Sequence, residues 1–592
     1  MLPSNPESAL ATMEPITPTF VRDTQALNRR SSSARNSYIQ DTHKVAYDND
    51  AFTSTYRAAH EMLLNAGLTT KDILALDSKF WNAHLDGSCA FDTAATTIFS
   101  VHINLCMGTL APYTRKQTNI QTLLAQLERF EVCGDFMLTE IGHGLDARNI
   151  ETTATLSHDG KYFDLHTPNL AAAKSMPPTT PLGGVPKVAV VFAQLVVAGE
   201  TRGVRTFIVR LTDGTNMCRG ISTMLLPQRP GNRALDHSIT TFNHVRLDRA
   251  DLLGELDGAG DKRQSFLSQI HRVSVGGLAL SLVNIPATKA GAYLCYTFSK
   301  GRTVINPKTA NPTSILAFPT QYGPIISAVA HAIVMESAAR FFIGIYQKKG
   351  VPEMLRQALV CIFKATITYS TQRHLSDLTD RCGWRGLFAH NKIAEMQLGL
   401  KGNSIAEGDV MVLCIRLASE LLQGKYTLPP SSTRTSPLAR HEQGLMATLG
   451  THLNPNSSAD APSHRSSLFA QNVTPRAVDL VQAIGHRFAY DSAQDDSSIG
   501  REFVDVWEAD CMLQDAGWYI EHAGFTNAEL HSRRVAAIER TLPYLEGVIR
   551  DWGMEKWFGD IPLTSRAAEE EFLRRLPMFE RRDMRIEIGS ML

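Results

Sequence analysis

The sequence predicts an α+β multidomain protein: an N-terminal α-helical domain, a small central β-barrel or sandwich, an α-helical bundle and an extra C-terminal α-helical domain. At 592 residues the chain is too long for a single compact core. Helical spacing of apolar residues dominates most of the chain, and one interior stretch changes to β-branched runs separated by turn signals. These observations give the order α, β, α, α.

The N-terminal part is predicted to contain two segments. Residues 1–45 contain Pro, Ser and Arg without sustained periodicity, so we expect a mobile or loosely docked leader. Residues 46–133 become helical, since apolar side chains in Tyr56–Leu64 recur three and four positions apart. This spacing predicts the first α-helical domain.

Residues 134–262 carry strand signals. Val188–Phe192, Thr206–Val209 and Ile239–Phe242 are β-branched runs bounded by Gly, Pro and Asp. The dipeptide Asp159-Gly160 is typical of a hairpin turn. We therefore expect a small β domain here.

Helical spacing returns in residues 263–425. Leu355, Leu359, Ile362 and Tyr369 recur at three, four and seven, as expected of one buried helix face. This pattern predicts a helical bundle.

The remaining chain is predicted to contain a linker and a last helical domain. Residues 426–470 are poor in apolar side chains and rich in Pro and Ser, which favours a linker or long surface loop. Helical texture resumes after it, so we expect an α-helical domain over residues 471–592.

Charge and cysteine usage exclude several functional classes. Lys plus Arg and Asp plus Glu each number 59, so no net field favours nucleic acid or an anionic membrane. The nine cysteines form no Cys-x-x-Cys pair, and His143 and His166 lack a second ligand at metal-site spacing, so we expect reduced thiols and no metal. The N-terminus lacks an apolar signal core and charged residues interrupt the most apolar stretch, 325–346, so we expect neither secretion nor a membrane span.

Four short motifs follow one another in the predicted β domain. They are TEIGHG at 139–144, ETTAT at 151–155, HTP at 166–168 and VVFAQL at 190–195. In this order, with strand-like segments between them, they resemble the central β-domain of the acyl-CoA oxidase family. The domain order is also similar, because an extra C-terminal helical domain distinguishes these oxidases from the shorter acyl-CoA dehydrogenases.

This resemblance implies an FAD-dependent oxidase or dehydrogenase that introduces an α,β double bond into an acyl thioester or related activated carbonyl. O2 would reoxidise the reduced flavin. The family also implies a homodimer, because its cofactor sites lie near subunit interfaces. Two alternatives stay open: a flavin enzyme of the same fold that desaturates or oxidises a non-CoA metabolite, and a degenerate, non-catalytic binding partner.

The resemblance implies that Glu407 is the catalytic base. Ile405–Asp409 matches the family pattern in which the catalytic carboxylate directly precedes a glycine. A base of this kind needs burial, because desolvation raises a carboxyl pKa toward working pH. Asp409 is the alternative base, and an acid that merely opens the predicted helix Val410–Leu422 is the plain structural alternative.

The resemblance also implies which residues bind the cofactor. Thr139 would hydrogen-bond the flavin, and Lys300 or Arg302 would hold the pyrophosphate. The segment Ile315–Pro324 resembles the start of the family's long buried helix. The full set expected to bind FAD is Thr139, Gly142, Gly144, Ser175, Lys300, Arg302, Gln321, Gly383 and Arg385.

Several departures from the family pattern concern the substrate pocket. Leu145 stands where a serine approaches the substrate, and Lys174–Pro178 lacks the two tryptophans that shield the flavin. Trp384 is bulky where the family has small residues, although Arg385 could pair with phosphate. The pair Gly276-Gly277 lacks the strand and spacing of a dinucleotide fingerprint.

The C-terminal tripeptide Ser590–Leu592 bears on localisation. It lacks the basic middle residue of the Ser-Lys-Leu peroxisomal address, so we expect the cytoplasm, with the peroxisome as the alternative. The altered pocket segments and this missing address favour specialised metabolism over bulk fatty-acid oxidation.

Overall fold

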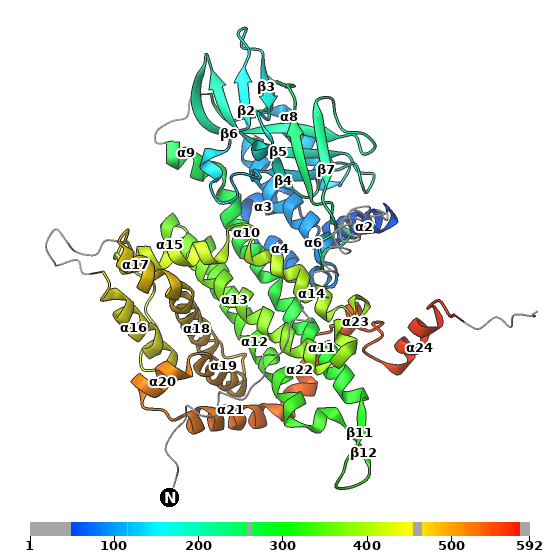
Figure 1. The fold of residues 1–592 in the computed structure, drawn as a ribbon, viewed down its shortest axis with the longest axis vertical. Helices are drawn as coiled ribbons and strands as arrows, with labels where there is room; N and C mark the ends of the chain where they lie inside the picture. The colour runs from blue at the N-terminus through cyan, green and yellow to red at the C-terminus, as the bar shows by residue number, and fades with distance from the viewer. Residues whose placement is uncertain (1–48, 115–116, 257–261, 454–463, 580–592) are drawn as a thin grey trace, which may run out of the picture. The chain divides into compact units, whose positions relative to one another are not determined.

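The computed structural model describes residues 49–114, 117–256, 262–453 and 464–579 (Figure 1). The described residues from Asp50 onward belong to one compact unit. The predicted leader, residues 1–45, and the C-terminal tripeptide lie outside the described residues.

The N-terminal region is helical, as predicted. Asp92 begins one buried helix, because its carboxylate accepts the N–H groups of Ala94 and Ala95 at 3.0 and 2.9 Å. That helix continues into a π-helical segment, a distortion that is frequent at functional sites. The helices are α2 (Asn49–Ala66), α3 (Thr70–Ala75), α4 (Ser78–Ala83), α5 (Gly87–Phe91), α6 (Thr93–Ser100), the π-helix η2 (Val101–Met107), α7 (Gly108–Leu110) and α8 (Thr118–Glu128).

The central region forms two β-sheets. The larger has the order β10-β6-β5-β2-β3-β9, with β1 parallel to β5, and the smaller has the order β4-β8-β7. In the larger sheet, the central strand β5 is a nearly continuous run of apolar residues, because both of its faces are covered. The strands are β1 (Cys133–Met137), β2 (Thr153–Leu156), β3 (Tyr162–His166), β4 (Lys174–Met176), β5 (Lys187–Val197), β6 (Glu200–Thr212), β7 (Ile221–Leu225), β8 (Ser238–Phe242), β9 (Val245–Asp248) and β10 (Leu252–Leu253).

The predicted hairpin at Asp159-Gly160 is confirmed. Strands β2 and β3 pair antiparallel with Leu156 opposite Phe163, and Gly160 adopts φ +70° in the turn between them. Glycine adopts this left-handed conformation without a steric penalty.

The third region is a helical bundle built around α13. This helix contacts α10, α11, α12, α14, α15 and α18, and the predicted apolar positions Leu359 and Ile362 are buried in it. The long helix α12 begins at Pro319, within the predicted entry segment Ile315–Pro324, and Pro324 lies inside the helix. The elements are α9 (Lys262–Gln269), α10 (His271–Leu282), α11 (Asn284–Gly301), β11 (Thr303–Ile305), β12 (Pro312–Ser314), α12 (Pro319–Gln347), α13 (Glu353–Arg381), α14 (Ile393–Leu400) and α15 (Val410–Leu422).

The last region is also helical, and part of the predicted linker belongs to it. Ser436 caps α16, and Leu438, Leu445 and Leu449 bury one face of this helix, so residues 437–450 are not a loop. Helices α16 and α18 pack together, and α18 packs on α12 and α13 (Figure 1). The helices are α16 (Pro437–Gly450), α17 (Ser467–Asn472), α18 (Ala477–Asp495), α19 (Arg501–Gln514), α20 (Ala516–Ala523), α21 (Asn527–Thr541), α22 (Leu545–Asp551), α23 (Glu555–Phe558) and α24 (Arg566–Arg574).

Three helical stretches are long and apolar enough to cross a membrane. They are Thr93–Tyr113, His271–Gly301 and Pro319–Gln347, and 94%, 78% and 61% of their most apolar windows are buried inside the protein. Core packing therefore accounts for much of their apolar surface. The expected absence of a membrane span stays a prediction.

The order of helical, β and helical regions confirms the predicted α+β fold class. The boundaries proposed between domains stay predictions, because the described residues after Asn49 cluster as one unit.

Candidate active site

The β domain brings Thr139 and Ser175 together. The Ser175 N–H group donates to the Thr139 carbonyl at 3.0 Å. Next to them, Lys174 and Glu140 form an ion pair of 2.9 Å with both side chains fully buried, and Glu140 also accepts the N–H groups of residues 151–152 at 2.7 and 3.0 Å. Because side chains alternate along extended chain, burial of this pair leaves Thr139 and Ser175 partly exposed on the other side.

The two glycines of the first motif differ in their surroundings. The Gly142 N–H group donates to the Ala171 carbonyl at 2.8 Å, and a Cβ at Gly142 would lie 2.9 Å from the Ala171 methyl carbon. Close backbone approach thus requires this glycine. Gly144 has nothing within 4 Å of a Cβ position, and the neighbouring Leu145 is 68% exposed.

The loop that carries Glu407 joins the short 3₁₀ helix η10 (Lys401–Ser404) to α15. Glu407 adopts φ +55° and Gly408 φ +99°, and the first value is uncommon for a residue with a side chain. Asp409 caps α15, since its Oδ1 accepts the Val412 N–H group at 3.2 Å. Asp409 therefore fulfils the helix-opening role that was the structural alternative for Glu407.

The Glu407 carboxyl group lies against α10. A Cβ on Gly276 would fall 1.4 Å from Glu407 Oε2 and 2.4 Å from Nδ2 of Asn104, a residue of the π-helix η2. Only glycine fits at position 276. Among the described residues, the buried Oε2 atom has no hydrogen-bond partner of good geometry, although the Asn104 amide lies beside the carboxyl group and favours its charged form.

This environment perturbs the acidity of Glu407. The residue as a whole is partly exposed, but burial of the carboxyl group raises the pKa of Glu407, and the charges of Lys364 and Arg272 oppose that rise. Arg272 is 6% exposed and donates to the Asn104 carbonyl at 3.0 Å, and burial lowers its pKa to about 10. A carboxylate whose pKa is raised toward neutral pH has the property that a general base requires.

Sequence reasoning did not find four of these residues: Asn104, Arg272, Gly276 and Lys364. Two of them could have been identified from the sequence, because the charged residues Arg272 and Lys364 interrupt otherwise apolar helical stretches. A cation on a buried helix face must find polar partners. The Gly276-Gly277 pair, which matches no dinucleotide fingerprint, makes room for a carboxylate instead.

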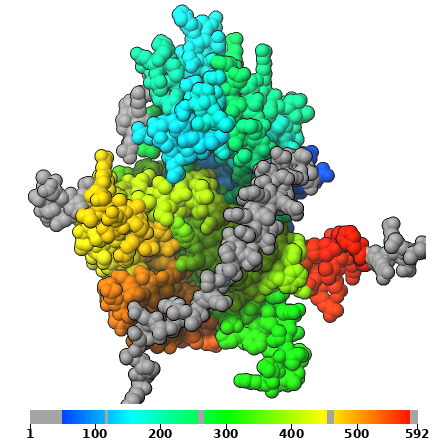
Figure 2. All heavy atoms as spheres, in the orientation of Figure 1, coloured from blue at the N-terminus to red at the C-terminus, as the bar shows by residue number. Residues whose placement is uncertain are grey.

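A separate group of predicted residues gathers at the far ends of α11 and α13. Gln321 Nε2 donates to Ser299 Oγ at 2.7 Å and to the Arg381 carbonyl at 2.9 Å. Gly383 follows α13 with φ +61°, and Arg302 is exposed beside the β11–β12 hairpin, which Figure 2 shows as a green projection. These residues form a second polar surface.

Two predicted cations of this surface are ion-paired with the C-terminal helices. Lys300 lies 2.5 Å from Glu546, and Arg385 lies 2.7 Å from Glu569. All four side chains are at least 30% exposed, so these pairs contribute little to stability and can exchange partners.

The predicted residues therefore do not form one cluster within the chain. Lys364 contacts the Glu407 loop and Arg381 contacts Gln321, and these two residues are 17 positions apart on the same helix. At 1.5 Å per residue the two places are about 26 Å apart along α13. The base and the second surface are thus well separated along the bundle.

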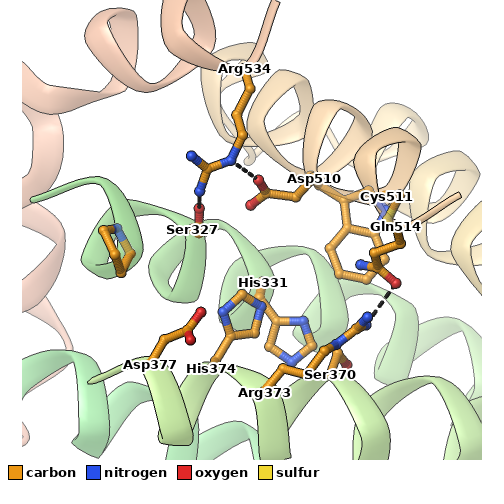
Figure 3. Close-up of a pocket in the computed structure, with 12 residues that line it drawn as sticks. Ser327, His331, Ser370, Arg373, His374, Asp377, Asp510, Cys511, Gln514 and Arg534 are labelled. Atoms are coloured by element: carbon orange, nitrogen blue, oxygen red, sulfur yellow. Dashed lines mark hydrogen bonds and ion pairs between the residues drawn. The ribbon is translucent and has the colours of Figure 1, made fainter. Parts of the chain in front are cut away.

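Two cavities of the helical region lie elsewhere. One of about 150 Å³ lies between α12, α13, α19 and α21, where Arg534 donates to Asp510 at 2.5 Å and to Ser327 at 3.0 Å (Figure 3). Burial lowers the pKa of His374 there to about 4, so this imidazole is neutral at pH 7. Another, of about 520 Å³, is lined by residues 424–431 with α16 and α18. Neither is lined by a predicted site residue.

Comparison with known proteins shows which family this chain resembles. The acyl-CoA oxidase C-alpha1 domain model matches residues 286–422. Human peroxisomal acyl-coenzyme A oxidase 3 is 25% identical over 358 residues, which cover 56% of this chain and 51% of that relative. The chain thus spans about half the length of this relative.

Solved structures share the fold over most of the chain. Acyl-CoA oxidase 1 from Yarrowia lipolytica matches with a TM-score of 0.70 at 15% identity, covering 91% of this chain and 90% of that one. Acyl-CoA oxidase-1 from Caenorhabditis elegans, solved in complex with FAD and ATP, matches with a TM-score of 0.67 at 16% identity, covering 89% and 92%. With the family model and the relatives, these matches confirm the predicted resemblance: the chain is similar in sequence to acyl-CoA oxidases and shares their fold.

Proposed function

We propose that this protein is an FAD-dependent oxidase that introduces an α,β double bond into an acyl-CoA thioester or a related activated carbonyl, with Glu407 as the base. One observation carries the proposal. Glu407 is a buried carboxylate with a raised pKa and an unpartnered oxygen, and it does not cap the following helix, because Asp409 does.

The residues present fit FAD. Thr139 and Ser175 offer adjacent, partly exposed polar groups on the β domain, which suit the edge of a flavin ring. Arg302, with Lys300 and Arg385 once their exposed ion pairs exchange, offers positive charge for a pyrophosphate. A C. elegans relative binds FAD, which supports the same cofactor here.

The protein's own groups would manage the proton of the reaction. Glu407 takes the proton from the carbon α to the thioester, and its burial keeps water from competing for that proton. Thr139 and Ser175 hold the polar edge of the cofactor. When bound, FAD supplies the acceptor for the hydride that leaves the β carbon, and O2 restores its oxidised form.

The side chain of Leu145 supports a second candidate function, in which the substrate is not an ordinary acyl-CoA. Its side chain is 68% exposed next to Thr139–Gly144, at the position where the family pattern has a serine that approaches the substrate. An apolar group there would suit a substrate without that polar contact, such as a carrier-bound or free specialised metabolite.

The separation of the two polar surfaces supports a homodimer. The residues of α13 that contact the Glu407 loop and Gln321 are about 26 Å apart along this helix. In a pair of chains, the second surface of one copy would complete the cofactor site of the other. Light scattering should then give twice the 65.2 kDa of the chain.

We propose a peroxisomal location in place of the expected cytoplasmic one. A similar human protein is named as peroxisomal, and no comparison supports the cytoplasm. Imaging of the tagged full chain in cells with marked peroxisomes would decide between the two compartments.

The first experiment is the visible spectrum of the purified protein, followed by anaerobic addition of acyl-CoA thioesters and free acids. A flavin spectrum that bleaches with a thioester, and release of FAD on denaturation, are expected. Glu407→Gln should keep the spectrum and lose the bleaching. A colourless protein that takes up no FAD would instead favour the non-catalytic binding partner.

A further inference from the structure

Lys364 is a buried cation in the middle of α13, and its side chain is 0% exposed. Its Nζ atom donates to three consecutive carbonyl groups of the base loop, those of Ala406 at 2.5 Å, Glu407 at 3.3 Å and Gly408 at 2.7 Å. One ammonium group therefore uses all three of its hydrogens on the loop.

This arrangement differs from an ordinary buried ion pair. Within the described part of the chain, no carboxylate oxygen lies within the 4.0 Å that defines an ion pair with Lys364. The charged groups facing it are Glu407 and Asp409, with the Cys361 thiol on its own helix, and Arg272 faces Glu407 from α10. The strongest opposite charge acting on Lys364 is thus that of the proposed base itself.

We propose that Lys364 is a positioning residue for Glu407: its ammonium ties the carbonyls of residues 406–408 so that the carboxylate stays directed at Gly276. This inference rests on the proposed function, because it gives the positioned carboxylate a catalytic task. It extends that function by naming a residue that acts on the reaction through the base and not by contact with substrate.

The Glu407 loop needs such an anchor because of the backbone conformation of Glu407. Glu407 holds a left-handed backbone conformation at φ +55°, which a non-glycine residue keeps only when its surroundings impose it. The helix cap of Asp409 fixes the chain after Gly408, and the Ile405 and Ala406 N–H groups bond Gly402 at 3.0 and 2.9 Å before it. Lys364 is the group that holds the carbonyls between these two fixed points.

Two variants separate hydrogen bonding from charge. Lys364→Met removes both, whereas Lys364→Gln removes the charge but keeps two N–H donors. Lys289→Met is the matched control, because Lys289 is a half-buried lysine of the same bundle that pairs with Glu336 at 2.8 Å and not with the loop. Melting temperatures show that each variant is folded.

The first readout is hydrogen exchange of peptides covering residues 401–409 in the purified full-length protein. We expect exchange to be about tenfold faster in Lys364→Met, nearer to wild type in Lys364→Gln, and unchanged in Lys289→Met. Equal exchange in Lys364→Met and the control would overturn the proposal. This readout does not depend on any activity.

The second readout is the pH dependence of flavin reduction by an acyl thioester. The Lys364 charge lowers the pKa of Glu407, so both Lys364 variants should need a higher pH for reduction, with the rate constant reduced and KM little changed. An unshifted pH profile would contradict the positioning of the base. If no thioester reduces the wild-type flavin while Lys364→Met still loosens the loop, the proposed function fails and the loop anchor stands.

Discussion

Gly276→Ala should remove activity by displacing the base. The added Cβ would fall 1.4 Å from Glu407 Oε2, whereas ordinary van der Waals contact begins at 3.4 Å. The carboxylate must therefore move by roughly 2 Å, or α10 must shift. Since a misplacement of about 1 Å can cost 10²-fold in rate, we expect flavin reduction to slow by at least about 10²-fold.

The adjacent glycine supplies the control for this experiment. A Cβ on Gly277 would lie 3.1 Å from Val360 Cγ1 and 3.6 Å from the Glu407 carbonyl, which small side-chain shifts relieve. Both changes replace glycine by alanine inside one helix, where propensity favours alanine by about 1 kcal/mol. Gly277→Ala should then keep nearly normal reduction.

The assay is anaerobic stopped-flow bleaching of the flavin, with the melting temperature of each variant measured alongside. We expect both proteins to remain folded and to bind FAD, and only Gly276→Ala to lose reduction. If Gly276→Ala reduces flavin at the wild-type rate, Glu407 does not act from the position seen against α10, and the steric argument is refuted.

Three further predictions follow from individual contacts. Burial raises the pKa of Glu407, so this group destabilises the fold as the pH rises above the ordinary glutamate pKa. The melting temperature of Glu407→Gln should therefore equal that of the wild type near pH 4.5 and exceed it at pH 8. A difference in melting temperature that does not change with pH would contradict this. Lys174→Met leaves Glu140 as an uncompensated buried charge, so chemical denaturation should show a loss of about 3–5 kcal/mol, and a neutral result would show that the pair is dispensable. Asp409→Ala removes the cap on the Val412 N–H group and should cost about 1 kcal/mol with flavin reduction retained, whereas abolished reduction in a folded variant would make Asp409 the base.

Local signals explain what could be predicted from the sequence. The helix Val410–Leu422 has the predicted bounds because Asp409 caps it within the local chain, and the β2–β3 hairpin follows from Asp159-Gly160. Glu407 stood out because a carboxylate before glycine matched a family pattern, and the loop geometry fits that interpretation. Residues close together in the chain were sufficient to predict each of these features.

The average composition of residues 426–470 led to a wrong prediction, because turn-forming residues surround a helix there. Residues 426–470 contain enough Pro and Ser to resemble a linker, yet Ser436 and Leu438–Leu449 form the capped, one-sided helix α16. Its apolar face is buried by packing on α18, which the local composition does not reveal.

The sequence by itself determined the fold class, the family resemblance and the candidate base, since each depends on residues that are close together in the chain. Only the tertiary structure decided what surrounds that base. Lys364 and Gly276 lie 43 and 131 positions from Glu407, and they meet it because α10 and α13 pack side by side. The burial that perturbs the carboxylate arises from this packing, so it is a property of the folded chain and not of any segment.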